Sequence, residues 1–217
     1  MSTELTQQEE YWDREVRAFD SIYSREKGAF GKFLDSVFRW DMYARYEYTL
    51  QHAEPIEGKT FLDVGCGTGR YAIELARRKA RHVVGLDIAE NMVEVCRARA
   101  AEEGLAERTT FIQSDLLQYR PAEKFDTCIG IGLFDYIRDP VPVLSRMCAS
   151  VNRSVIVSFP KRRTWRAPLR KVRLGLKGCG VYFYSMKRLE AVLKQSGFAD
   201  FRCQEVGQLY CVTAYPK

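Results

Sequence analysis

The stretch Phe61-Leu62-Asp63-Val64-Gly65-Cys66-Gly67-Thr68-Gly69-Arg70 is an apolar run followed by three alternating glycines. The apolar run predicts a β-strand over residues 60–65, and the residues after the glycines predict a helix over residues 70–79. Glycines between a strand and a helix permit a sharp turn, and a ligand can approach the backbone there because no Cβ stands in the way. The stretch therefore predicts a strand, a ligand-binding turn and a helix.

The spacing of the glycines, at positions 65, 67 and 69, indicates the class of ligand. A dinucleotide-binding fingerprint, GxGxxG, has its last glycine one residue later, so this spacing argues against a nicotinamide cofactor. Asp87 ends a second predicted strand, 24 residues after Asp63. An acidic side chain at that strand end can accept hydrogen bonds from both hydroxyls of a ribose. The two features together predict a site for a ribose-containing ligand.

The rest of the chain alternates short β-branched runs with helical stretches. Strands are predicted over residues 60–65, 81–86, 108–113, 125–131 and 154–159, and helices over residues 70–79, 89–104, 140–150 and 186–196. Such alternation predicts a parallel sheet with helices on both faces. Residues 201–206 and 209–214 are separated only by Gly207 and Gln208, which predicts an antiparallel hairpin at the edge. The expected fold is α/β, a doubly wound and mostly parallel sheet of seven strands.

The first fifty residues are rich in aromatic side chains. Phe30, Phe33, Leu34, Val37 and Phe38 recur at helical spacing and predict one apolar helix face. We expect residues 1–55 to form a helical segment that covers the active site. Residues 56–217 would form the core, with a basic insertion on the substrate side at residues 160–184.

Composition limits the classes of protein that fit. A chain of 217 residues with 46% hydrophobic and 29% charged residues predicts one globular domain. Its first residues lack the basic region followed by an apolar region that marks a signal peptide. No apolar stretch approaches the ~18 residues needed to span a bilayer, so we expect a cytoplasmic protein. The seven cysteines include no CxxC pair, and His52 and His82 lie far apart, so no metal site is expected.

The formal charge of +6 is distributed unevenly. Residues 140–189 contain twelve Lys or Arg and no Asp or Glu. The density is highest over residues 161–177, which could contact an anionic acceptor or a membrane surface. A solvated face whose acidic neighbours lie elsewhere in the fold explains the pattern equally well.

The sequence resembles the class I S-adenosylmethionine-dependent methyltransferases in two segments, LDVGCGTGR at residues 62–70 and GLDIAENMV at residues 85–93. The resemblance implies S-adenosyl-L-methionine as the cofactor and S-adenosyl-L-homocysteine as the product. It implies that Asp63 helps to place the amino group, that Asp87 binds the ribose and that Asp115 lies near the adenine. The other cofactor-binding residues that it implies are Gly65, Gly67, Gly69, Ile88, Met92, Leu116, Gly130 and Gly132.

A finer resemblance links the chain to the magnesium-protoporphyrin O-methyltransferase branch. It uses Tyr23 within Ile-Tyr-Ser, a helix containing Arg39, the strand at residues 155–160, and Tyr182-Phe183-Tyr184 after the basic stretch. That branch esterifies a propionate, and a carboxylate acceptor needs no general base. For an alcohol or a phenol, Asp135 or Tyr136 could accept the proton.

Methyl transfer also requires alignment of the acceptor and exclusion of water. Tyr23, Tyr11 or Trp12 could flank the sulfonium through a ring face, although core packing is the commoner role. Asp135 could equally be the N-cap of the following helix, and Asp115 the cap of a short turn.

We expect methyl transfer to a small acceptor that is anionic or amphipathic, with O-methylation favoured. An RNA methyltransferase that grips phosphates through the basic segment is one alternative, disfavoured because the basic tract is short. A cofactor-binding module without catalysis is another alternative. It is disfavoured because the glycine turn shows no sign of damage to the cofactor-binding pattern. The sequence does not specify the oligomeric state.

Overall fold

The computed structural model describes residues 29–162 and 180–217, together with Thr6 and Trp12. The predictions for Tyr11, Tyr23 and most of residues 161–177 therefore lie outside the described residues. In chain order the elements are α2 (Ala29–Ala53), β1 (Thr60–Val64), α3 (Arg70–Arg77), β2 (His82–Asp87), α4 (Glu90–Glu102), the 3-10 turn η1 (Ala106–Arg108), β3 (Thr109–Gln113), β4 (Phe125–Gly130), α5 (Pro140–Ala149), β5 (Val151–Pro160), α7 (Met186–Gln195), β6 (Phe198–Val206) and β7 (Leu209–Pro216).

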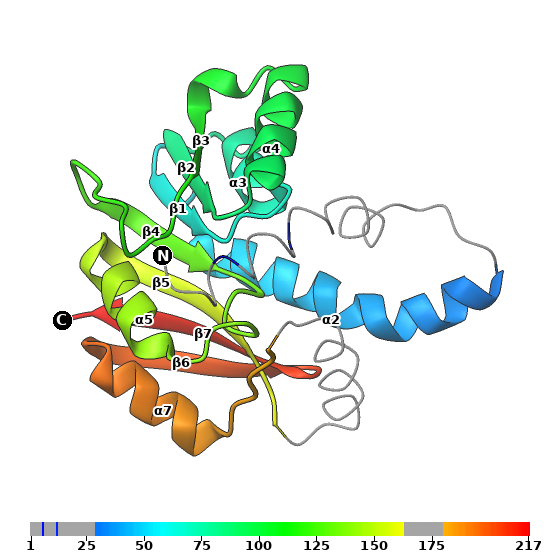
Figure 1. Ribbon diagram of the computed structural model, residues 1–217, viewed down its shortest axis with the longest axis vertical. Coiled ribbons are helices and arrows are strands. Elements are labelled where there is room, and N and C mark those ends of the chain that lie inside the picture. The colour runs from blue at the N-terminus through cyan, green and yellow to red at the C-terminus, as the bar shows by residue number, and fades with distance from the viewer. Residues whose placement is uncertain (1–5, 7–11, 13–28, 163–179) are drawn as a thin grey trace.

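The strands form one seven-stranded sheet in the order β3-β2-β1-β4-β5-β7-β6 (Figure 1). The first five pair in parallel, whereas β7 is antiparallel to both β5 and β6. The order reverses direction at β1, because the chain runs outward to β3 and then returns to β4 on the other side. The predicted fold class is confirmed. In open α/β sheets the ligand crevice lies at such a reversal, here at the carboxyl ends of β1 and β4.

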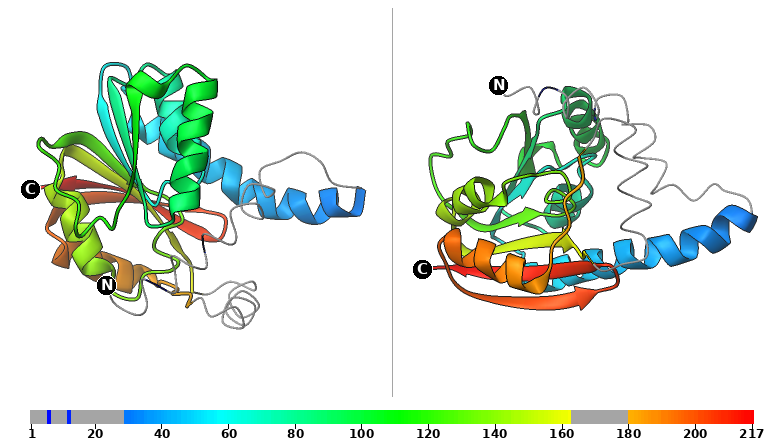
Figure 2. Two further views of the ribbon diagram at one scale, coloured as in Figure 1. Left: turned by 45° about the horizontal axis from the view of Figure 1, so that its top comes forward. Right: turned by 60° about the horizontal axis from the view of Figure 1, so that its bottom comes forward.

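Helices cover both faces of the sheet (Figures 1 and 2). On one face, α2, α3 and α4 pack through a cluster that contains Leu50, Ile73 and Val93. On the other, α5 and α7 pack through Leu144 and Leu189. The central strands contribute apolar side chains to both clusters, which explains their nearly continuous hydrophobic sequences.

Helix α2 is attached to the sheet by its C-terminal half, and its first turns extend beyond the sheet (Figures 1 and 2). The hydroxyls of Tyr48 and Thr213 are 2.9 Å apart, which links the helix to β7. Arg153 of β5 donates from Nη2 to the carbonyl of Ala53 at 2.6 Å and from Nη1 to that of Glu54 at 2.7 Å. These bonds satisfy carbonyls that the end of a helix leaves without intrahelical donors. Within the described part of the chain, no helix is both long enough and apolar enough to cross a bilayer.

We expect Arg153→Ala to lower the free energy of unfolding by about 2 to 3 kcal/mol, because charged hydrogen bonds to Ala53, Glu54 and the hydroxyl of Thr127 are lost together. Urea unfolding measures this change. Arg202→Ala removes an exposed arginine of β6 and serves as the control. Equal stabilities of the two variants would contradict the anchoring role of Arg153.

Candidate functional site

The glycine turn follows β1 at the carboxyl edge of the sheet. Gly65, Gly67 and Gly69 have φ angles of 67°, 54° and 80°, in the left-handed region that favours glycine. The amides of Gly65 and Cys66 both donate to the carbonyl of Leu86, at 2.8 and 3.0 Å, so the turn is attached to β2. Gly69 is the N-cap of α3. The strand, turn and helix predicted from the sequence are therefore present.

Asp87 and the glycine turn form one hydrogen-bonded unit. The carboxylate of Asp87 accepts from the amide of Gly67 through Oδ2, at 2.8 Å, and from the amide of Ala89 through Oδ1, at 3.1 Å. The side chain is 9% exposed. The sequence predicted that both features serve one ligand, but it did not predict that Asp87 itself fixes the conformation of the turn.

Two buried thiols lie at the turn, Cys66 within it and Cys96 on α4. Cys96 donates through Sγ to the carbonyl of Gly67 at 3.0 Å, and a Cβ added at Gly69 would lie 3.0 Å from the same sulfur. A hydrogen bond with Cys96, together with burial, raises the pKa of Cys66 well above its ordinary value. Both residues are reduced, as the sequence predicted, and they restrict the space behind the turn.

Asp63 lies within β1 and is 1% exposed. Its Oδ2 has no hydrogen-bond partner among the described residues. Burial, reinforced by the negative charge of Asp87, raises the pKa of Asp63 to about 7, while an amide hydrogen bond from Ala72 opposes the shift. A buried carboxylate with an oxygen left over is suited to a ligand that brings positive charge or hydrogen-bond donors.

Asp63→Asn is expected to remove a pH dependence of folding stability. Because the folded-state pKa of about 7 exceeds the ordinary 3.8, the folded state binds this proton more tightly, and stability falls as the pH rises from about 4 to 7. Asn keeps the shape without the charge, so the variant should exceed the parent by up to about 4 kcal/mol at pH 8 and match it near pH 4. Urea unfolding of the cofactor-free protein across this range tests the expectation. Parallel pH profiles for variant and parent would contradict it.

The loop after β4 brings a second set of residues to the same edge. Gly132 has a φ of 78°, and its amide donates to Oγ of Ser158 at 2.9 Å. A Cβ added at Gly132 would lie 3.4 Å from Nη1 of Arg45 on α2, so a guanidinium group stands beside this loop. The sequence pointed to Arg39 on this helix and not to Arg45, because a sequence does not specify which distant loop a helix faces.

Gly130, at the end of β4, packs closely against α5. A Cβ added there would lie 2.9 Å from Cε of Met147 in α5. This glycine allows close packing between β4 and a helix on the buried face. The backbone contact of Gly130 with the methionine part, which the resemblance implied, stays a prediction.

Asp135 and Tyr136 follow Gly132, and the two residues have different surroundings. Asp135 is 3% exposed, and its carbonyl accepts from the amide of Tyr182 at 2.8 Å. The rings of Tyr136 and Trp12 meet edge to face, with centroids 5.0 Å apart, in a small apolar cluster with Val181 and Phe183. Trp12 is thus the described residue of the N-terminal segment that reaches this loop.

The N-cap of α5 is Asp139, which accepts from the amide of Val141 at 3.2 Å. The alternative interpretation of Asp135 as the helix N-cap is therefore wrong. The helix begins with Pro140, and proline suits the first helical position because it has no amide hydrogen to satisfy. The buried carboxyl of Asp135 thus needs an explanation other than helix capping.

The residues implied for the adenine end lie along β2, α4 and the turn after β3. Oδ1 of Asp115 accepts from the amide of Leu117 at 3.0 Å, so Asp115 does cap a short turn, as the alternative interpretation held. Met92 and Leu116 are buried, and Ile88 is half-buried. These side chains could form the apolar walls of an adenine pocket.

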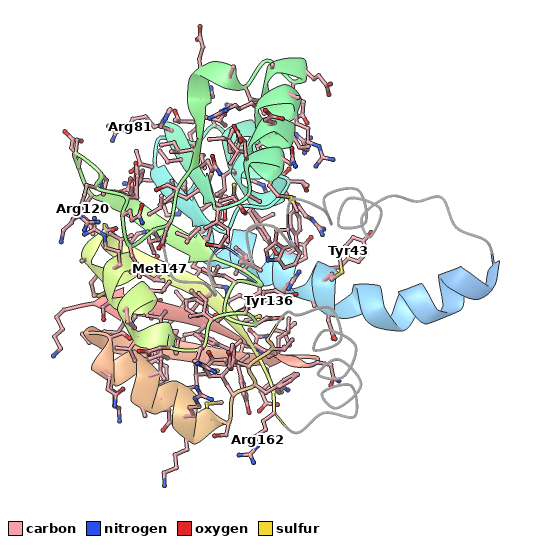
Figure 3. The ribbon with its side chains drawn as sticks, in the orientation of Figure 1. Tyr43, Arg81, Arg120, Tyr136, Met147 and Arg162 are labelled. Carbon is pink, nitrogen blue, oxygen red and sulfur yellow. The ribbon has the colours of Figure 1, made fainter. Side chains whose placement is uncertain are left out.

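The two histidines lie at element ends. His82 begins β2, and its Nε2 is 3.0 Å from Oγ1 of Thr110. His52 lies in the last turn of α2, with Nδ1 2.9 Å from the carbonyl of Tyr48. Arg81, just before β2, and Tyr136, which follows β4, lie well apart in Figure 3. His82, next to Arg81, is therefore far from the crevice.

Comparison with known proteins identifies the family. A family described as "Methyltransferase domain" matches residues 56–164, half of the chain. The chain belongs to the class I S-adenosylmethionine-dependent methyltransferases. The predicted family is confirmed, and S-adenosylmethionine is the cofactor of this methyltransferase.

Three similar proteins indicate the range of the family. The ubiquinone biosynthesis O-methyltransferase of Vibrio cholerae is 32% identical over 69% of this methyltransferase and 60% of that protein. The tRNA U34 carboxymethyltransferase of Haemophilus influenzae is 28% identical over 82% of this chain and 56% of that protein. The chain thus spans less than two thirds of the length of either relative. The magnesium protoporphyrin IX methyltransferase of Synechocystis PCC 6803, crystallised with S-adenosylhomocysteine, shares the fold with a TM-score of 0.79 and 22% identity, over 98% of this chain and 99% of that one.

The residues at the crevice of this methyltransferase fit the cofactor. The glycine turn exposes backbone without side chains, Asp87 presents a carboxylate beside it, and Oδ2 of the buried Asp63 has no described partner. S-adenosylmethionine carries ribose hydroxyls, an ammonium group and a sulfonium, all of which suit carboxylates. Among the described residues, no group of three or more His, Cys, Asp or Glu is placed to hold a metal ion.

Proposed function

We propose that this methyltransferase transfers a methyl group from S-adenosylmethionine to a small acceptor that is anionic or amphipathic, at an oxygen atom. The observation that carries the proposal is the hydrogen bond from the amide of Gly67 to Asp87, which joins the glycine turn and the ribose-binding acid into one preformed site. O-methylation draws support from the named activity of the Vibrio cholerae relative.

For cofactor binding, we propose that Gly65, Gly67 and Gly69 contact the methionine and ribose portions, and that Asp87 binds the ribose. Asp63 would help to place the amino group, since its buried carboxyl has an oxygen without a described partner. Gly130 and Gly132 would approach the methionine part through their backbone. Ile88, Met92, Asp115 and Leu116 would surround the adenine. Tyr23 stays a predicted covering residue and lies outside the described residues.

On the acceptor side, the proposal rests on the residues around the loop after β4. Trp12 and Tyr136 form an aromatic wall there, and Arg45 brings a positive charge to Gly132. An aromatic wall beside a cation suits a small molecule that has both an apolar and an anionic part. Three further points stay predictions. They are the boundary at residue 55 between the helical segment and the core, the membrane contact of residues 161–177, and the cytoplasmic location.

In the reaction, the residues of the chain would exclude water, place a positive charge near the acceptor and accept a proton. S-adenosylmethionine, when bound, supplies a methyl group on a positively charged sulfur for in-line attack by the acceptor atom. Trp12 and Tyr136 would exclude water, which favours a reaction in which two opposite charges disappear. Arg45 would place a positive charge beside the acceptor oxygen, and Asp135 would accept the proton of a hydroxyl acceptor. For a carboxylate acceptor, Asp135 would only position the substrate.

We expect His52→Gln and His82→Gln to leave the turnover number within about a few-fold of the parent, because neither side chain can reach the crevice. Asp135→Asn should lower turnover of a hydroxyl acceptor by about 100-fold, through loss of the base and of alignment. A single-turnover assay of methyl transfer measures all three variants. A collapse of activity in a folded His82→Gln variant would contradict this assignment.

The acceptor class is tested by incubating the methyltransferase with radiolabelled S-adenosylmethionine and either small aromatic acids and phenols or bulk tRNA. We expect label in the small molecules. Label in tRNA, with binding that weakens steeply as salt rises, would instead favour RNA as the acceptor, which the tRNA-modifying relative makes a specific alternative. Calorimetry with S-adenosylhomocysteine tests the cofactor site separately, and absence of binding would overturn the proposal.

A further inference from the structure

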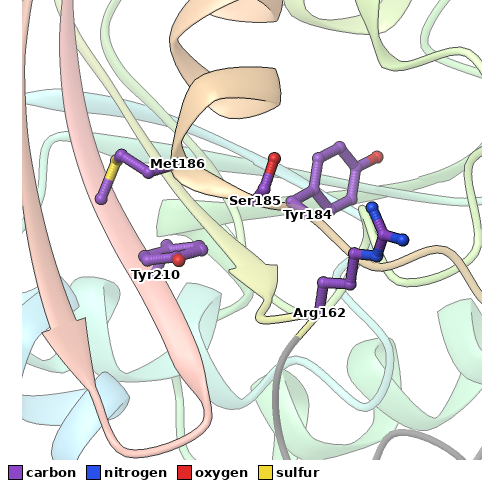
Figure 4. Close-up of a pocket in the computed structure, with 5 residues that line it drawn as sticks. All are labelled: Arg162, Tyr184, Ser185, Met186 and Tyr210. Atoms are coloured by element: carbon purple, nitrogen blue, oxygen red, sulfur yellow. The ribbon is translucent and has the colours of Figure 1, made fainter.

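A cavity of about 560 Å³ lies outside the cofactor crevice. Of the described residues, its lining includes Arg162, Tyr184, Ser185, Met186 and Tyr210 (Figure 4). These residues come from the segment after β5, the start of α7 and the start of β7. The amide of Arg162 donates to the carbonyl of Tyr184 at 2.9 Å, which holds two sides of the cavity together. No function described above uses this cavity.

The polar side of the cavity is electropositive. Arg162 is exposed and makes no side-chain hydrogen bond or ion pair with the described residues. Ser185 caps α7 by accepting from the amide of Arg188 at 3.3 Å, and the first turn of the helix contains no acidic residue. The amides of Met186 and Lys187 have no intrahelical acceptor at this position, and the helix dipole adds partial positive charge. Lys161, by contrast, is neutralised by Glu205 at 2.6 Å.

The other side of the cavity is apolar, with Met186 and Tyr210 in its lining. Tyr210 is buried, and Met186 is half-buried. Tyr184 is 0% exposed, and its hydroxyl has no hydrogen-bond partner in the described part of the chain. The ring is fixed between Phe159, at 4.8 Å between centroids, and the guanidinium of Arg188, at 4.9 Å. Because the hydroxyl of Tyr184 has no accessible surface, the side chains that the cavity offers to a ligand are those of Arg162, Ser185, Met186 and Tyr210.

The position of the cavity relates it to methyl transfer. It lies at the carboxyl end of β5, the same edge as the glycine turn, and the sheet order there is β1-β4-β5-β7. Neighbouring strands are ~4.8 Å apart, so the space beyond β5 lies roughly 10 Å from the crevice between β1 and β4. That separation is within the length of one elongated acceptor molecule.

We propose that this cavity is a subsite for the anionic end of an elongated amphipathic acceptor, which carries its anionic group roughly 10 Å from the methylated atom. Arg162 and the first turn of α7 bind the anion, and Met186 and Tyr210 contact the apolar body next to it. This inference rests on the proposed function, because it specifies the acceptor of the same enzyme.

The test is NMR spectroscopy of the full chain, labelled with 13C at the methionine methyl groups. Met186 lines the cavity, and its resonance is identified as the one that Met186→Leu removes. The probe is 1-naphthoate, and the neutral comparison is 1-naphthylmethanol, which has a similar shape. We expect naphthoate to shift the Met186 resonance, and Arg162→Ala to weaken its binding about tenfold, as loss of a charged hydrogen bond predicts. Arg120→Ala, at an exposed arginine distant from Arg162 in Figure 3, is the matched control and should bind as the parent does.

Three outcomes would overturn the proposal. The first is no shift of Met186 with naphthoate. The second is equal binding of the acid and the alcohol, unaffected by Arg162→Ala. The third is a response to inorganic phosphate alone as strong as that to naphthoate, which would indicate a site for free anions. Calorimetry with S-adenosylhomocysteine on the same sample keeps the two proposals separate. If S-adenosylhomocysteine does not bind, the proposed methyl transfer is refuted, whether or not the Met186 resonance shifts with naphthoate.

Discussion

Asp87→Ala is expected to weaken binding of S-adenosylhomocysteine by about 100-fold or more while the chain still folds. Hydrogen bonds to an ionised acceptor contribute about 1.5 to 3 kcal/mol each, and the proposed ribose contacts comprise two of them. The variant also loses the bonds from Gly67 at 2.8 Å and Ala89 at 3.1 Å, so the turn itself becomes less ordered. Isothermal titration calorimetry measures the change.

The control is Asp200→Ala, on the edge strand β6. That carboxylate is exposed and accepts from the adjacent amide of Phe201 at 2.8 Å, far from the glycine turn. Its loss removes the same charge from the chain without touching the crevice. Parental affinity in Asp87→Ala would show that the ribose lies elsewhere.

Gly67→Val is expected to abolish detectable binding of S-adenosylhomocysteine. The φ of Gly67 is 54°, a conformation that costs a residue with a Cβ about 1 to 2 kcal/mol. A branched side chain would also occupy the space through which the ligand approaches the backbone. The two effects can be separated, because the first lowers stability and the second lowers affinity.

Gly104→Val separates them. Gly104 follows α4 with a φ of 67°, and an added Cβ there would meet no atom within 4 Å. We expect both glycine variants to lose similar stability in thermal unfolding, with cofactor affinity lost only in Gly67→Val. If Gly67→Val loses as much stability as Gly104→Val but binds S-adenosylhomocysteine as tightly as the parent, the cofactor does not bind at this turn.

Much of the fold was predictable because its signals are local. The glycines at 65, 67 and 69 need positive φ angles, and the apolar run before them has the length of a buried strand. The helix predicted over residues 140–150 is α5 (Pro140–Ala149), since Asp139 and Pro140 mark its start. These preferences depend on a few consecutive residues, so they hold whatever the rest of the chain does.

The boundaries of two strands were not predicted. β5 begins at Val151, three residues before the prediction, because Arg153 bonds to the end of α2 and its polarity concealed the strand. β6 begins at Phe198 rather than at residue 201, with a register shift near Asp200. It is an edge strand with mostly exposed side chains, and exposure weakens the alternation that reveals a strand.

The sequence by itself determined the family, the glycine turn and the acid at position 87, because each is a pattern within one short stretch. Only the tertiary structure decided that Arg45 meets Gly132, that Trp12 meets Tyr136, and that Arg162 and Tyr210 line one cavity. Periodicity specifies which face of a helix or strand is apolar, but it does not specify which distant face covers it. That choice depends on sheet order and register, which arise from packing of the whole chain.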